Sequence, residues 1–120
     1  MTVDTLSLAG KTALVTGSGK ETGIGAAIAR AFARNGAAVA IHYVSENSKV
    51  RAEKVAADIN QEFGTKTTVV QGALENAGTA TKIVLETLKG LDATHIDILG
   101  TYLYEKPQTL SDGTLRLTRL

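Results

Sequence analysis

TALVTGSGKETGIGAAIA, residues Thr12–Ala29, joins an apolar segment to a glycine-rich loop and the beginning of a helix. Ala13–Val15 favour a short strand, and from Gly23 onward the apolar residues recur with helical spacing, at Ile24, Ala27, Ile28, Ala31 and Phe32. Glycines let the backbone approach a phosphate closely, and the N–H groups at a helix start attract negative charge. We therefore expect this loop to bind a nucleotide.

The loop does not match the P-loop of ATPases and GTPases. Gly10-Lys11-Thr12 has the P-loop ending but precedes the strand, and Thr5 stands where the first glycine is required. Gly19-Lys20 is followed by Glu21, which offers no hydroxyl to magnesium. A loop that only connects strand and helix remains an alternative. The pattern otherwise indicates a dinucleotide-binding fold.

From about Leu8 to Leu99 the sequence resembles the short-chain dehydrogenases/reductases, whose loop is T-G-x-x-x-G-x-G. Thr16-Gly17 and Gly23-Ile24-Gly25 are similar to its two ends, with five residues between them where the family usually has three. If Gly19 is taken as the first glycine of the motif, three residues separate it from Gly23-Ile24-Gly25, as in the family. In that alignment Ser18 stands where the family has threonine. The resemblance implies that the backbone from Ser18 to Ile24 holds the pyrophosphate and the adenosine ribose, and that Gly25 packs the helix closely against the strand.

Composition excludes several other classes of protein. The chain has 120 residues, 13 basic and 12 acidic side chains and a net charge of +1, so no nucleic-acid partner is implied. It has no cysteine, and we expect His42 and His95 to be strand residues, not metal ligands. Met1–Gly10 contains no apolar run, which predicts a cytoplasmic protein without a signal peptide or membrane span.

The hydrophobic periodicity predicts an α/β fold, a partial Rossmann sheet of βαβαβαβ order with strand order 3-2-1-4 and a short irregular tail. Asn35-Gly36 is expected to end the first helix, Gly64 the second and Gly90 the third, and Asn76 to cap the third. The strands expected after the first one are 37–44, 67–71 and 94–99, and the helices are 23–34, 48–63 and 79–89. Residues 1–99 would form an NADP-binding half-domain and 100–120 the tail.

The end of the second strand indicates which cofactor is preferred. Enzymes that use NAD place an acidic residue there for the ribose 2′-hydroxyl, whereas this chain has no carboxylate before Glu46. Ser45, Asn47 and Ser48 can bind a phosphate with Lys20 or Lys49 nearby, although 45–48 is equally suited to a polar turn and helix cap. We expect NADP more than NAD, bound by Gly17, Ser18, Gly19, Lys20, Gly23, Ile24, Tyr43 and Ser45.

Two segments depart from the family pattern. The family usually has an aspartate for the adenine after the third strand, where this chain has Gly72-Ala73-Leu74. The catalytic elements that the resemblance implies, an Asn-Asn-Ala-Gly segment, a serine and a helical Tyr-x-x-x-Lys pair, do not follow Leu99. Tyr102 and Lys106 have the pair's spacing, but Pro107 disfavours a helix at Lys106. We therefore expect no catalytic residue in this chain.

The tail has one local pattern, since Asp112-Gly113 predicts a small hairpin. By resemblance the chain is an NAD(P)-dependent carbonyl reductase or alcohol dehydrogenase that lacks its catalytic half and is inactive alone. Two alternatives stay open, a non-catalytic nucleotide-binding or protein-interaction module and a complete small reductase that uses Tyr102 and Lys106. A small carbonyl or alcohol is the expected substrate, no metal or membrane partner is expected, and the edge of the fourth strand predicts self-association.

Overall fold

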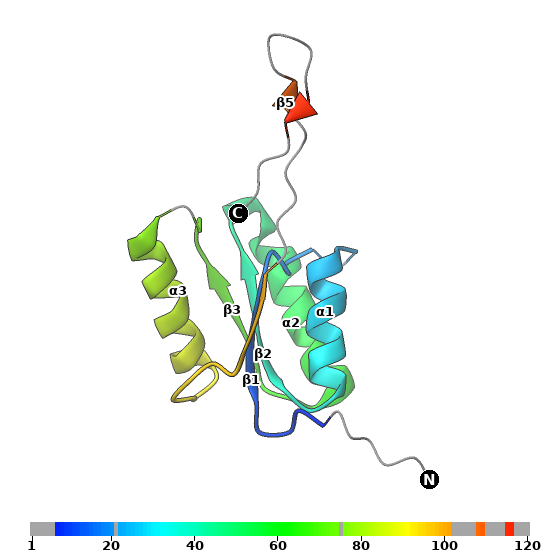
Figure 1. The fold of residues 1–120 in the computed structure, drawn as a ribbon. Coiled ribbons are helices and arrows are strands. Elements are labelled where there is room, and N and C mark those ends of the chain that lie inside the picture. Colours follow the sequence, from blue (N-terminus) through cyan, green and yellow to red (C-terminus); the bar gives the residue numbers. More distant parts are fainter. Residues whose placement is uncertain (1–6, 21, 75, 102–107, 110–114, 117–120) are drawn as a thin grey trace.

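Four parallel strands form the centre of the molecule, and the order β3-β2-β1-β4 confirms the predicted sheet (Figure 1). The computed structural model describes residues 7–20, 22–74, 76–101, 108–109 and 115–116. The strands are β1 Thr12–Thr16, β2 Ala38–Tyr43, β3 Thr67–Gln71 and β4 Ile98–Thr101. The helical elements are α1 Ile24–Arg34, the 3-10 turn η1 Glu46–Ser48, α2 Lys49–Phe63 and α3 Ala77–Gly90.

The face of the sheet under α1 and α2 carries the larger core. Val15 and Ile41 are fully buried there against alanines of α1 and the apolar stripe of α2, which includes Val55 and Ile59. Small residues on α1 let this helix lie close to β1 and β2. Each fully buried branched side chain of this kind contributes roughly 1.5–3 kcal/mol to folding.

The opposite face is covered by α3 (Figure 1). Leu14 and Ala40 of the sheet pack there with Val70, Ile83 and Leu91. His42 projects to this same face, because it lies two residues beyond Ala40 on β2 and successive strand residues alternate between faces. The His42 side chain is buried there.

The predicted ends of the helices are largely confirmed. Asn76 caps α3, since its side-chain oxygen accepts hydrogen bonds from the N–H groups of Gly78 and Thr79 at 2.8 and 3.4 Å. Gly64 ends α2 in the left-handed conformation, with a φ of 71°. After α1 only Gly36 is left-handed, with a φ of 104°, whereas Asn35 donates its side-chain N–H to the Ala31 carbonyl instead.

Gly90 is the last residue of α3, so the helix stops where expected, but the glycine lies inside the helix and not after it. The helix includes Gly90, Leu91 follows it, and Asp92 takes the left-handed conformation with a φ of 51°. A Cβ atom at Gly90 would collide with the side chain of Thr68 on β3. The glycine therefore lets the helix approach the sheet.

The fourth strand begins at Ile98, four residues later than predicted. The Asp97 carboxylate accepts a hydrogen bond from the Thr12 N–H at 2.9 Å, and the Asp97 N–H donates to the Thr12 carbonyl at 2.9 Å. Asp97 thus fixes the entry to β4, and the residues before it form a loop. His95 lies exposed in that loop, so the prediction that it is a strand residue is wrong. β4 continues to Thr101, beyond the boundary expected at Leu99.

The tail contains the predicted antiparallel pairing. β5 Gln108–Thr109 pairs with β6 Leu115–Arg116, with Gln108 opposite Arg116. The turn residues Asp112 and Gly113 lie outside the described residues, as do Tyr102 and Lys106.

Candidate functional site

The glycine-rich loop connects the carboxyl end of β1 to the start of α1. Gly17 leaves the strand in the left-handed conformation, with a φ of 67°, which glycine adopts without steric cost. At the start of α1, Gly23 provides no side-chain cap, and the first turn contains no acidic residue. The positive end of the helix is therefore available to an anionic group.

Gly25 holds the loop against the helix. A Cβ atom there would lie 2.5 Å from the Gly17 carbonyl oxygen and 3.0 Å from the Ser18 Cα. Both neighbours are backbone atoms, so neither can rotate away. The resemblance implied that Gly25 packs the helix against the strand; the close contact is made instead with the loop directly after β1.

Ser18 faces into the protein. Its side chain is fully buried, and its Oγ donates to the Val15 carbonyl at 2.6 Å and accepts from the His42 N–H at 3.1 Å. Its own N–H donates to the His42 carbonyl at 3.0 Å. Ser18 therefore donates its hydroxyl to β1 and its N–H to β2, and has no donor left over for a ligand.

The His42 ring connects the loop to β3. The Gly17 N–H donates to Nδ1 at 3.0 Å, and Nε2 lies 2.7 Å from the Gly72 carbonyl oxygen. Burial lowers the pKa of His42, and the hydrogen bond to Gly72 offsets part of that effect. The segment that departs from the family pattern at Gly72 thus has a specific partner here.

The end of β2 forms the other wall of the site. The Tyr43 side chain is buried, and its hydroxyl donates to Gln71 Oε1 at 3.4 Å. Burial raises the pKa of the Tyr43 phenol, and Glu46 raises it further. Ser45 is exposed, and its Oγ accepts from the Asn47 N–H at 3.2 Å, which confirms the capping interpretation of this turn.

A cleft of about 220 Å³ lies between the loop and the end of β2. Five of the predicted residues line it, namely Gly17, Gly19, Lys20, Tyr43 and Ser45. Ser18, Gly23 and Ile24 do not line it; Gly23 and Ile24 lie at the start of α1. The other lining residues are His42, Val44 and Ser48, and no carboxylate is among them.

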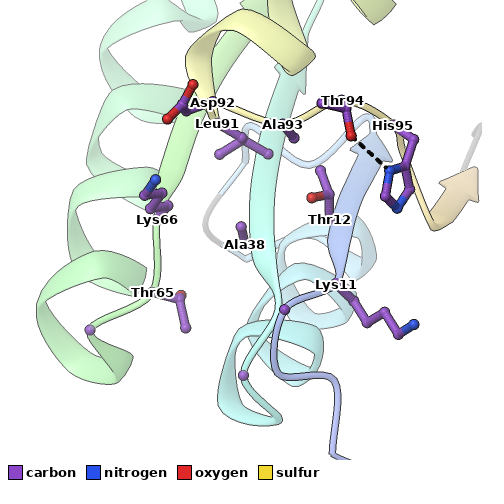
Figure 2. A pocket seen from close by; sticks show the side chains of 13 residues that line it. Lys11, Thr12, Ala38, Thr65, Lys66, Leu91, Asp92, Ala93, Thr94 and His95 are labelled. Carbon is purple, nitrogen blue, oxygen red and sulfur yellow. Dashed lines mark hydrogen bonds between the residues drawn. The ribbon is translucent and has the colours of Figure 1, made fainter.

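A larger cavity of about 500 Å³ lies at the opposite, amino end of the strands (Figure 2). Lys11 before β1 and Lys66 before β3 are on its wall, and Thr94 lies beside His95, whose Nδ1 is 3.1 Å from the Thr94 hydroxyl. In open α/β sheets ligands bind outside the carboxyl ends of the strands. The smaller cleft beside the glycine-rich loop is therefore the candidate site.

In the described part of the chain, no group of three or more His, Asp or Glu side chains is placed to hold a metal ion. None of the described helices has the length and apolarity that crossing a membrane requires.

A family model described as enoyl-(acyl carrier protein) reductase matches residues 17–100. The chain is 32% identical to an NADP-dependent mannitol dehydrogenase of Alternaria alternata over 116 residues, which covers 96% of this chain and 41% of that protein. Across eight curated relatives, the chain covers 26% to 41% of their length. It therefore spans less than half of each of these eight relatives.

Solved structures share the fold. A dehydrogenase/reductase from Sinorhizobium meliloti superposes with a TM-score of 0.77 at 36% identity, over 91% of this chain and 40% of that one. A structure from Burkholderia cenocepacia, described as a dehydrogenase with bound NADP, gives a TM-score of 0.71 at 35% identity, over 82% and 36% of the two chains.

Proposed function

Because the chain belongs to the short-chain dehydrogenase/reductase family, we propose that its glycine-rich loop binds NADP and serves an oxidoreductase that acts on a carbonyl or alcohol. The observation that carries this proposal is the cleft at the carboxyl ends of β1 and β2, beside the uncapped start of α1. Nicotinamide cofactors supply hydride transfer when bound. The residues of this chain bind and orient the dinucleotide.

The site has the chemistry that a phosphorylated ribose requires. The N–H groups at the start of α1 attract the pyrophosphate, since no acidic side chain competes for them in the first turn. Lys20 and the hydroxyls of Ser45 and Ser48 line the cleft and are suited to the 2′-phosphate. A carboxylate at this position would repel that phosphate, and the described cleft contains none.

Changing Ser45 to aspartate is expected to remove the preference for NADPH over NADH. A new negative charge beside a 2′-phosphate costs about 1 to 3 kcal/mol when the pair is partly shielded from water. The measurement is a fluorescence titration of both reduced cofactors with the native chain and the variant. Ser45→Asn is the matched control, because it has the same shape without the charge and should keep the preference. Equal affinity of the native chain for both cofactors would contradict the assignment.

A second candidate function is a nucleotide-binding or protein-interaction module without catalysis. The 120 residues span at most 41% of the eight curated relatives, and the part that they span contains the dinucleotide cleft. Both functions require the dinucleotide site, so a binding measurement cannot distinguish them. A measurement of catalytic turnover can, because only the oxidoreductase would show it. In either case we propose that the protein is cytoplasmic.

We further propose that the chain self-associates through β4. Leu99 on this strand is 65% exposed, and in the described part of the chain β4 pairs only with β1. An open strand edge with an apolar side chain recruits further strands. Leu99→Lys should shift the protein toward monomer in sedimentation-velocity experiments, whereas the control Leu85→Lys, which removes an exposed leucine from α3, should not. A native chain that is monomeric at high concentration would refute this proposal.

A further inference from the structure

His42 is the residue of β2 on which the glycine-rich loop is fixed. Its backbone N–H and carbonyl both bond Ser18, and its ring accepts the Gly17 N–H. On the other side the ring reaches the Gly72 carbonyl, and the Gly72 N–H donates to the Tyr43 carbonyl at 3.1 Å. One residue thus connects the first two residues of the loop to the end of β3.

These partners determine the protonation state of the ring. A backbone N–H can only donate, so Nδ1 must accept from Gly17 and carries no proton. A carbonyl can only accept, so Nε2 must donate to Gly72. We call the two hydrogen bonds from the ring to Gly17 and Gly72 the His42 bridge. This bridge requires the neutral imidazole with its proton on Nε2. A doubly protonated ring would place two N–H donors against each other at Gly17.

We propose that His42 is the positioning residue of the dinucleotide site: as a neutral imidazole it holds Gly17 against the end of β3, and its protonation releases the loop and weakens cofactor binding. This inference rests on the proposed function, because it concerns the same cleft, which His42 lines. The ring does not itself need to touch the cofactor. It acts through the geometry of Gly17 and Ser18.

The surroundings of His42 contain few groups that titrate. β1 and β3 carry no ionisable side chain. Among the described residues, the charged groups on the neighbouring elements are Lys20 of the loop, Glu46 beyond β2, and Lys82, Glu86 and Lys89 of α3. Lys82 and Glu86 pair with each other at the surface. Both ring nitrogens bond backbone groups, so none of these side chains replaces the partners of the ring.

The sign of the pH dependence follows from the burial. The pKa of His42 is lowered in the folded chain from its ordinary value of about 6.5. The unfolded chain therefore takes up a proton first as the pH falls. The stability that the neutral ring provides is complete above about pH 6.5 and decreases below it, until the lowered pKa of the folded state is reached.

The bridge can be tested on the native chain without any ligand. Two-bond ¹⁵N–¹H correlation spectra of the imidazole near neutral pH should place the proton of His42 on Nε2. The Gly17 amide should exchange slowly with deuterium, and exchange should accelerate in His42→Phe, which has neither acceptor nor donor. A proton on Nδ1, or rapid exchange of Gly17 in the native chain, would overturn the proposal.

The effect of the His42 bridge on cofactor binding is measured by calorimetry with NADP⁺ and NAD⁺. NAD⁺ is included because it lacks the 2′-phosphate, which itself titrates near pH 6. His42→Phe should bind both about 2- to 10-fold more weakly than the native chain at about pH 7.5. His42→Gln, whose planar amide has one acceptor and one donor and does not titrate, should restore most of the affinity. His95→Gln is the control and should change nothing.

As the pH is lowered through the pKa of folded His42, the native chain and His95→Gln should lose affinity for NAD⁺, whereas the affinity of His42→Gln should not change. An unchanged affinity in His42→Phe, or the same loss with pH in His42→Gln, would contradict the role of His42. If the native chain binds neither dinucleotide at any pH, the proposed function fails, while the spectra and amide exchange still decide whether the His42 bridge exists.

Discussion

Gly25→Ala is expected to abolish dinucleotide binding and to lower the melting temperature of the chain. The new Cβ would lie 2.5 Å from the Gly17 carbonyl oxygen and 2.9 Å from the Gly17 carbonyl carbon. Relief requires the loop or α1 to move, and overpacking of this kind costs about 1–3 kcal/mol. Because the clash falls on the backbone of the loop itself, the site is displaced as well as destabilised.

The sign of this effect distinguishes packing from helix propensity. Alanine in a helix interior is normally more stable than glycine by about 1 kcal/mol, so propensity alone predicts a gain at Gly25. Gly78→Ala in α3 is the matched control, because its Cβ meets only the Asn76 side-chain oxygen at 3.2 Å. Circular dichroism should show a lower melting temperature for Gly25→Ala and an unchanged or higher one for Gly78→Ala. A gain in both variants would refute the close contact.

The second large effect that we expect is the absence of catalysis by these 120 residues alone. Hydride transfer requires a nicotinamide held near a carbonyl and an acid placed to protonate the developing alkoxide. The described cleft is suited to the pyrophosphate and adenosine end of the cofactor. A positioned acid contributes a factor of roughly 10²–10⁴ to the rate, and we expect Tyr102 not to supply it.

The experiment follows NADPH oxidation with a panel of quinones, ketones and aldehydes, in samples whose cofactor binding is measured in parallel. The expected result is binding without turnover, both in the native chain and in Tyr102→Phe. Turnover in the native chain that disappears in Tyr102→Phe would show instead a complete small reductase that uses Tyr102 and Lys106.

Much of the fold was predictable because its signals are local. The change of hydrophobic spacing between Val15 and Ile24 correctly predicts a strand followed by a helix. The apolar run in 37–44 predicts a strand covered on both faces, as β2 is. Parallel order with right-handed crossovers then leaves few arrangements, and β3-β2-β1-β4 is the one observed.

The errors arise where a long-range contact decides the local structure. Thr94–Leu99 alternates like a strand, but the bonds between Asp97 and Thr12 delay β4 until Ile98. Gly90 ends α3 as expected, but its contact with the Thr68 side chain on β3, which only a glycine permits, is not visible in the sequence pattern. Neither partner can be identified from sequence spacing alone.

The candidate site, like the fold, was predictable from the sequence only in part. The glycines and the polar end of β2 were predictable from their residue types, whereas the inward direction of Ser18 and the bridging role of His42 were not. The available signal was the single polar residue His42 within an otherwise apolar strand. A buried polar side chain needs hydrogen-bond partners, but the sequence does not say which segments provide them.

The most direct test of the account is a calorimetric or fluorescence titration of the purified chain with NADPH and NADH side by side, with Gly25→Ala as the variant that lacks the site. We predict saturable binding of one molecule per chain, tighter for NADPH than for NADH, and no binding to Gly25→Ala. A native chain that is folded by circular dichroism and yet binds neither dinucleotide would contradict the central claim that this loop is a nicotinamide-dinucleotide site.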